Sequence, residues 1–242
     1  VACPAKEEIC ANGRDDDFDG AADCDDDACT AHPSCLPPES ICDDGADDDL
    51  DGDVDCDDVD CIADPVCAAT PRARLVINEI DYNQSGTDAG EFIEIFNAGN
   101  ADADLTGLEL IAINGSGSVE DYLLSTNDRI HLSGTLAAGG YLVIGNAGVT
   151  VPAGVTKIEF PDNKLQNGPD AVVLYDSLNG VIVDAFSYGG EITTDASVPG
   201  IGGAQLWFGT ASTLQDAASG DVSLIRHPDG TATGNDAIDW AR

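Results

Sequence analysis

The chain has 242 residues, of which 46 are acidic and 9 are basic, so its formal net charge is −37 at pH 7. A surface this negative excludes the basic face that nucleic-acid binding needs, and it disfavours attraction to anionic lipid. Apolar residues make up 43% of the chain, which is enough for a sizeable core.

The acidic residues and the cysteines are concentrated in the first part of the chain. Residues 1–67 carry 23 acidic and 2 basic side chains, a net charge of −21, together with all nine cysteines. Such a density of cysteine indicates disulfides formed in an oxidising compartment. A zinc site is the weaker alternative, because no Cys-x-x-Cys pair is present and His32 is the only histidine of this segment.

Two features of the whole chain bear on its location. It begins at Val1 rather than at a methionine, and it contains neither a signal-peptide pattern nor an apolar run long enough to span a membrane. Together with the cysteines, these features predict a processed, secreted protein outside the cell or on its surface, with no direct insertion into a membrane.

Residues 10–67 contain two copies of one sequence, offset by 32 positions, each with an Asp-x-Asp-x-Asp-Gly core. Four cysteines frame each copy: Cys10, Cys24, Cys29 and Cys35 in the first, and Cys42, Cys56, Cys61 and Cys67 in the second. This repetition indicates two structural units built on one plan.

The ninth cysteine, Cys3, is equivalent by spacing to Cys35 and Cys67. Two pairing schemes stay open. If each of these three cysteines bonds the next cysteine along the chain, Cys3 bonds Cys10, Cys35 bonds Cys42, and Cys67 is left over. If each pairs within its own repeat, Cys3 is left over. In both schemes the surplus thiol lies at one end of the repeats, where a neighbouring molecule could reach it.

The acidic cores match the ligand pattern of a calcium loop. Such a loop offers oxygens at positions one, three, five, seven, nine and twelve, with glycine at position six and a backbone carbonyl at position seven. The predicted ligands of the first copy are Asp15, Asp17, Asp19, the carbonyl of Ala21, Asp23 and Asp26. Those of the second copy are Asp47, Asp49, Asp51, the carbonyl of Asp53, Asp55 and Asp58.

The sequence therefore predicts at least two bound Ca²⁺ ions. Since the repeats contain few apolar residues, metal and disulfides are expected to supply most of their order. The alternative is a solvated, disordered acidic tail. That alternative is disfavoured, because the same glycine and the same cysteine frame recur in both copies.

Cysteines and prolines flank these loops where an EF-hand would have helices, and position twelve is Asp rather than Glu. In these respects residues 3–67 resemble thrombospondin type-3 repeats and the Cys/Asp-rich repeats of secreted bacterial surface proteins. The resemblance implies loops and disulfides that wrap calcium without helices.

Residues 68–74 are a predicted linker, and the rest of the chain consists of short β-branched runs separated by Gly, Asn and Asp. The predicted strands are 75–82, 92–96, 108–113, 129–132, 141–144, 157–160, 171–175, 181–187 and 222–226. Residues 172–186 are typical of a hairpin whose loop ends at Gly180. Many short strands without helical periodicity predict an antiparallel β-sandwich over residues 75–242.

Several stretches then match a known family: LVINEIDYNQSGTDAGEFIEIFNAG (75–99), DLTGLEL (104–110), LAAGGYLVIGN (136–146), DAVVLYDSLNGVIVDAFSYG (170–189) and SLIRHPDGT (223–231). In their order they resemble the lamin tail domain. The resemblance implies an immunoglobulin-like β-sandwich from about Leu75 to Trp240. In bacterial proteins it also implies a domain without catalysis of its own, found beside surface proteins or extracellular hydrolases.

The sandwich region carries little that indicates an enzyme. His131 and His227 are its only histidines, and no Gly-x-Ser-x-Gly or HExxH motif is present. Glu79, Glu91 and Glu94 could form a carboxylate pair for acid–base chemistry if their strands are adjacent. The alternative is that they face solvent or cap loops, and we expect no enzymatic activity.

The predicted function is that of a secreted, calcium-stabilised structural protein that assembles with itself into a surface filament or matrix. Contacts between the acidic repeats of one copy and the sandwich of the next would be head-to-tail and so could continue without closing. The alternatives are a non-catalytic adhesion module for a glycan or a surface protein, and an accessory region of a secreted hydrolase. Trp207, Phe208 and Tyr188 are the candidate rings for a sugar.

Overall fold

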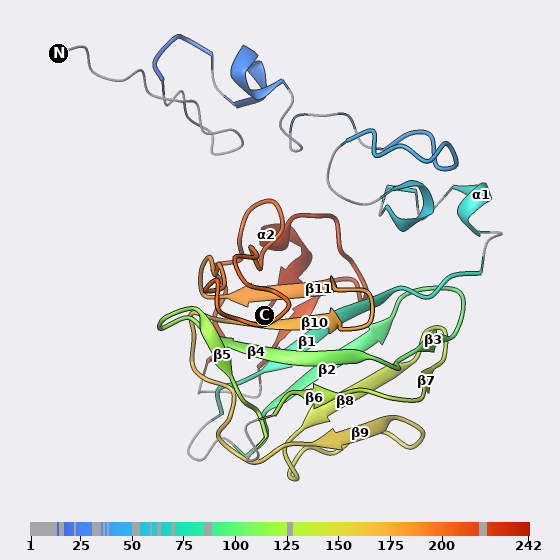
Figure 1. Ribbon diagram of the computed structural model, residues 1–242, viewed down its shortest axis with the longest axis vertical. Coiled ribbons are helices and arrows are strands. Elements are labelled where there is room, and N and C mark those ends of the chain that lie inside the picture. The colour runs from blue at the N-terminus through green and yellow to red at the C-terminus, as the bar shows by residue number, and fades with distance from the viewer. Residues whose placement is uncertain are drawn as a thin grey trace. The chain divides into compact units, whose positions relative to one another are not determined.

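The computed structural model divides into two compact units, Val1–Thr70 and Pro71–Arg242, and each is described by itself (Figure 1). The boundary falls within the predicted linker. The structure describes residues 14, 17–21, 23–30, 35, 37, 39–49, 54–58, 60–61, 64–68, 71–84, 89–124, 128–217 and 222–242, with the backbone alone at 23, 57 and 68.

The first unit, which we call the repeat module, is built from turns and single helical turns. Its short elements are η1 (Asp23–Asp25), η2 (Asp27–Cys29), η4 (Asp55–Asp57) and α1 (Pro65–Ala68). Aspartate carboxylates make most of the turns, because each accepts a hydrogen bond from the backbone N–H two residues later. This bond is present at Asp17, Asp19, Asp26, Asp44, Asp58 and Asp64.

Disulfides bond cysteines of the same repeat. The bridges join Cys24 to Cys35, Cys42 to Cys61, and Cys56 to Cys67. The forward scheme is therefore wrong, since Cys35 bonds Cys24 rather than Cys42, and Cys67 is not left over. Cys3 and Cys10 lie outside the described residues. Disulfides of this kind indicate an oxidising compartment.

Sulfur also forms the interior of the second repeat. Cys42, Cys61 and Cys67 are buried together, and Cys56 packs against them. The bridges Cys24–Cys35 and Cys56–Cys67 have the same sequence separation of 11 residues and the same Cα–Cα distance of 5.1 Å. The two copies therefore share one covalent plan, and cystines take the place of an apolar core.

The second unit is a β-sandwich of two facing sheets (Figure 1). Across the first sheet the order is β13 (Trp240–Ala241), β12 (Leu224–Arg226), β1 (Leu75–Asp81), β2 (Phe92–Asn97), β8 (Tyr141–Gly145) and β9 (Thr156–Glu159). Across the second it is β11 (Val181–Tyr188), β10 (Asp170–Asp176), β4 (Leu108–Asn114) and β5 (Val119–Asp121), with β6 (Ile130–His131) also on β4. Two short strands, β3 (Ala103–Asp104) and β7 (Thr135–Leu136), pair separately, and α2 spans Asp236–Asp239.

The predicted fold class is confirmed, and all nine predicted strands are present with small shifts at their ends. The hairpin is also present, because Asp176 pairs with Val181 and Gly180 adopts the left-handed φ of 74° that the turn requires. One pairing differs from the antiparallel expectation, since β9 runs parallel to β8. The short strands β3, β5, β7 and β13 were not predicted.

The two central strands of the second sheet, β4 and β10, are buried on both faces. Alternate residues of β4 enter the inner core between the sheets, whereas Ile111 and Ile113 point to the outer face. There the segment 192–206 covers them, with Leu206 fully buried in the same cluster. This second layer explains why β4 and β10 are almost continuously apolar in sequence.

A buried arginine ties the end of the sandwich to its beginning. β12 pairs with β1, and Arg226 donates from Nε to the carbonyl of Ile77 at 2.8 Å and from Nη2 to both oxygens of Asp184 at 3.1 Å. The guanidinium also lies 4.8 Å from the ring centroid of Trp240. Strands β12 and β13 are therefore an integral part of the first sheet.

Every helix in the part of the chain that the structure describes falls short of the length and apolar character of a membrane span.

Candidate metal centre

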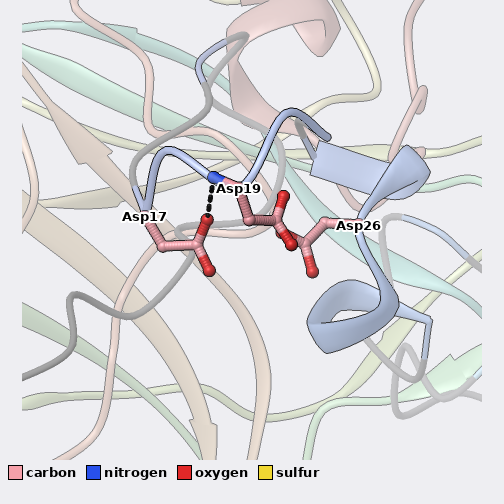
Figure 2. A group of neighbouring side chains, drawn as sticks. All are labelled: Asp17, Asp19 and Asp26. Atoms are coloured by element: carbon pink, nitrogen blue, oxygen red, sulfur yellow. Dashed lines mark hydrogen bonds between the residues drawn. The ribbon is translucent and has the colours of Figure 1, made fainter.

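Three predicted ligands of the first repeat meet in the structure. One carboxylate oxygen from each of Asp17, Asp19 and Asp26 lies within 4.8 Å of the others. Figure 2 shows the carboxylates of Asp19 and Asp26 facing each other, with that of Asp17 beside them. These residues occupy positions three, five and twelve of the predicted loop, so a tight turn brings together groups that lie up to nine residues apart.

Local hydrogen bonds create this turn. Asp17 Oδ1 accepts from the N–H of Asp19 at 3.0 Å, and Asp19 Oδ1 accepts from the N–H of Ala21 at 2.9 Å. Gly20, between Asp19 and Ala21, has a φ of 104°, which a residue with a Cβ rarely adopts. Asp26 caps η2, since its Oδ1 accepts from the N–H of Ala28 at 2.6 Å. In each of the three carboxylates it is Oδ1 that accepts the turn-forming backbone bond.

Asp26 is the most constrained member of this group. Asp26 is 2% exposed, and its Oδ2 has no hydrogen-bond partner in the part of the chain that the structure describes. A buried carboxylate oxygen without a partner is costly, because the ion loses water and gains nothing in return. A cation among the three carboxylates would remove that cost.

The second repeat contains two further carboxylate groups, and Glu39 belongs to both. Glu39, Asp47 and Asp49 form one, and Glu39, Asp44 and Asp55 form the other, again with oxygens within 4.8 Å of one another. Glu39 and Asp44 were missed by the sequence prediction, which followed the Asp-x-Asp-x-Asp-Gly core. The spacing contained a signal, because Glu39 recurs 32 positions earlier as Glu7.

The other predicted ligands divide into four kinds. Ala21 follows Gly20 in the turn, where its N–H donates to Asp19 Oδ1. Asp58 belongs to none of these groups of described residues; its Oδ1 accepts from the N–H of Asp60 at 2.6 Å, the same turn that Asp26 makes. Asp23 is described in its backbone only, in η1. Asp15, Asp51 and Asp53 lie outside the described residues. The counterpart of the Asp17–Asp19–Asp26 group, which needs Asp51, is therefore a prediction still.

The donor chemistry of these groups is uniform. All members are carboxylates, which are the ligands that Ca²⁺ prefers, and calcium accepts irregular shells of six to eight oxygens. The described cysteines offer no thiolate, since all seven are disulfide-bonded. This finding disfavours the zinc alternative, which needs sulfur ligands.

The carboxylates singled out in the sandwich serve the fold. Glu79 of β1 pairs in register with Glu94 of β2, so their strands are adjacent as expected. Glu79 accepts a hydrogen bond from Ser223 Oγ, and Glu94 Oε1 accepts from Asn78 Nδ2 at 2.9 Å. Burial raises the pKa of Glu79, and it raises the pKa of Glu94 to about 6, because desolvation disfavours the charged carboxylate.

Glu91 has the loop-capping role that was the alternative for these residues. Its side chain is buried, and Oε2 accepts a hydrogen bond from the backbone N–H of Lys164 at 2.9 Å. The backbone of Glu91 also exchanges two hydrogen bonds with Asn146. Glu91 therefore fixes the segment after β9 against the start of β2.

The candidate sugar-binding rings are only partly accessible. Tyr188 is 1% exposed and stacks on Tyr82 with ring centroids 4.3 Å apart, so the proposal of Tyr188 as a sugar platform is wrong. Phe208 is 39% exposed and Trp207 is half-buried. The His131 imidazole is 60% exposed on β6.

Comparison with known proteins adds a family. No curated protein matches the chain. The family model for the Lamin Tail Domain matches residues 68–190. The matched segment contains all the strands from β1 to β11: the second sheet, four of the six strands of the first, and the β3–β7 pair. Because the match covers half of the chain and its strands build the sandwich, the chain belongs to the lamin tail domain family.

Proposed function

We propose that this chain is a secreted extracellular structural protein whose acidic repeats bind Ca²⁺ and so order a rigid module attached to a lamin tail domain. The observation that carries the proposal is the convergence of Asp17, Asp19 and Asp26, with a buried oxygen of Asp26 to which no described residue donates a hydrogen bond. The resemblance of the repeats to thrombospondin type-3 loops supports the same reading.

Electrostatics gives a second reason. The repeat module carries a net charge of −21 and has cystines in place of a hydrophobic core. Compaction of so many carboxylates is opposed by their mutual repulsion unless cations neutralise them. Metal binding then contributes directly to the free energy of folding of the module.

The test is a count of ions on the intact, oxidised chain. After dialysis against buffer with millimolar Ca²⁺, elemental analysis is expected to find at least two ions per chain. Asp26→Asn is expected to lose one ion, because it removes the charge while keeping the cap on η2. Asp25→Asn, an exposed neighbour, is the matched control and is expected to lose none. A wild-type chain without stoichiometric calcium would contradict the proposal.

We further propose that the protein assembles with itself, the acidic repeats of one copy meeting the sandwich of another. Apolar side chains on the β10–β11 hairpin and the edge strand β11 favour such a contact. Leu178 is 72% exposed, Val181 50% and Val183 37%. Multi-angle light scattering with and without Ca²⁺ is expected to show larger species with calcium. A monodisperse monomer in millimolar calcium would end this part of the proposal.

Glycan binding is a second candidate function, supported by the exposed ring of Phe208 beside the half-buried Trp207. Stacking of a sugar on such rings is a common mode of recognition. A glycan array with the wild type and with Phe208→Ala is the test. Binding that the variant loses would favour this function over self-assembly.

A further inference from the structure

We propose that Glu39 is a ligand shared by two neighbouring cation sites in the second repeat. Asp47 and Asp49 complete one site, and Asp44 and Asp55 complete the other. This inference rests on the proposed calcium binding and adds to it a count and an arrangement: two ions that meet at one glutamate.

The side chain of Glu39 has the features of a ligand. The residue is 5% exposed, and its Oε1 has no hydrogen-bond partner among the described residues. Its Oε2 accepts from the N–H of Asp48 at 2.8 Å. That bond fixes the carboxylate at the loop that carries Asp47 and Asp49. Glu39 is a member of both carboxylate clusters. Its unpartnered oxygen is therefore available to a cation bound in them.

The second site is held by a separate set of backbone bonds. Asp55 Oδ1 accepts from the N–H of Asp44 at 2.8 Å and from the N–H of Gly45 at 3.0 Å. These bonds join two segments that are eleven residues apart and bring their carboxylates together. Asp55 has a left-handed φ of 53°, a conformation that is uncommon for a residue with a Cβ. The backbone at Asp55 is thus held in place by its surroundings.

Charge balance favours two ions over one. The two groups together contain five carboxylates, so a single divalent cation would leave three uncompensated negative charges around the buried Glu39. Two divalent cations would leave only one uncompensated negative charge. A carboxylate has two oxygens with about four lone-pair sites, so it can bind two cations at once. Calcium suits this arrangement, since it tolerates irregular shells and mixed mono- and bidentate carboxylates.

The sequence supports a specific role for this glutamate. Glu39 is repeated 32 positions earlier as Glu7, whereas the residue before it changes from Lys6 to Pro38. The glutamate is therefore part of the repeat plan, although it lies outside the Asp-x-Asp-x-Asp-Gly core.

Equilibrium dialysis of the intact, oxidised chain against CaCl₂ tests the inference by counting bound ions. Glu39→Gln is expected to lose two ions relative to the wild type. Asp44→Asn and Asp47→Asn are each expected to lose one, because each removes a ligand of one site only. Asp43→Asn, an exposed residue in neither group, is the matched control and is expected to lose none.

The outcomes separate this inference from the proposal beneath it. If the wild type binds calcium but Glu39→Gln loses one ion or none, the shared ligand is wrong and calcium binding stands. If the wild type binds no calcium, calcium binding itself is wrong. Glu39→Gln could also prevent the whole module from folding, in which case calcium would no longer change its circular dichroism. The ion counts of Asp44→Asn and Asp47→Asn then test the two-site arrangement. Failure of either variant to release an ion then overturns the two-site arrangement.

Discussion

At the scale of single residues, Arg226 has the largest side chain among the fully buried ones that the structure describes. The sequence does not indicate that this arginine is buried, because it simply follows Leu224 and Ile225 at the end of a short strand. The sandwich accommodates it by supplying Asp184 and Asp239, whose carboxylates lie 3.1 and 3.5 Å from the guanidinium nitrogens. A buried charge of this kind is stable only when partners compensate it.

Arg226→Met is expected to destabilise the sandwich by about 3–5 kcal/mol, since it leaves two buried carboxylates without their cation. Chemical denaturation followed by tryptophan fluorescence measures the change. Arg242→Met at an exposed position is the control and should change stability by less than about 0.5 kcal/mol. Equal stabilities of the two variants would show that Arg226 is dispensable.

Asp236 predicts a pH dependence. Burial raises its pKa from 3.8 to about 7, against the lowering effects of the hydrogen bond from Phe208 N and the charge of Arg226. Between these pH values the folded state binds more protons than the unfolded state, so this group makes the free energy of unfolding fall as pH rises from about 4 to about 7.

Asp236→Asn should therefore reduce that fall, with the variant gaining on the wild type at pH 7 more than at pH 4. Urea denaturation at fixed calcium across this range is the measurement. Asp162→Asn, an exposed carboxylate, is the control and should leave the slope unchanged. A slope equal to that of the wild type in Asp236→Asn would refute the assignment.

At the scale of elements, the covering segment 192–206 buries the outer face of β4 and β10. Leu206 is 0% exposed in the outer cluster, whereas Leu178 in the β10–β11 loop is 72% exposed. Leu206→Ala is expected to cost about 2–5 kcal/mol through lost burial and a cavity. Leu178→Ala is the matched control, expected to cost less than about 0.5 kcal/mol. Stability measured by denaturation would contradict this if both changes were small.

Most of the sandwich could be predicted because its strands carry strong local signals. β-Branched runs such as those of β1 and β10, and the Asn179–Gly180 turn, indicate strands and a hairpin without any knowledge of contacts. The parallel partner of β8 could not be predicted in this way. The run that becomes β9 is equally compatible with either direction, and the choice depends on the path of the 146–155 segment.

The candidate site was predicted only in part for a similar reason. The alternation around Gly20 predicts that Asp17 and Asp19 point to one side, and the structure places Asp26 with them. Glu39 lies outside the loop pattern, so only the folded chain brings it to Asp47 and Asp55. The disulfide scheme likewise stayed open, because spacing alone gives two consistent solutions and the geometry selects one.

At the scale of the whole molecule, the two units are expected to respond differently to chelation. Among the described residues, all three clusters of carboxylates that could hold a metal ion lie in the repeat module. Both tryptophans, Trp207 and Trp240, lie in the sandwich. EDTA is expected to change the far-UV circular dichroism and protease resistance of the repeats. The urea midpoint reported by tryptophan fluorescence should stay the same. A shift of that midpoint would show that the sandwich depends on metal.

The pairing of β1 with β12 has a consequence for the order in which the sandwich folds. Ile80 and Leu224 are partners although 144 residues separate them, so the first sheet stays incomplete until almost all of the domain has been synthesised. Contacts between such distant segments form slowly. The sandwich therefore cannot close around β1 until β12 is available, so β1 waits with one edge unpaired while the strands between them are made.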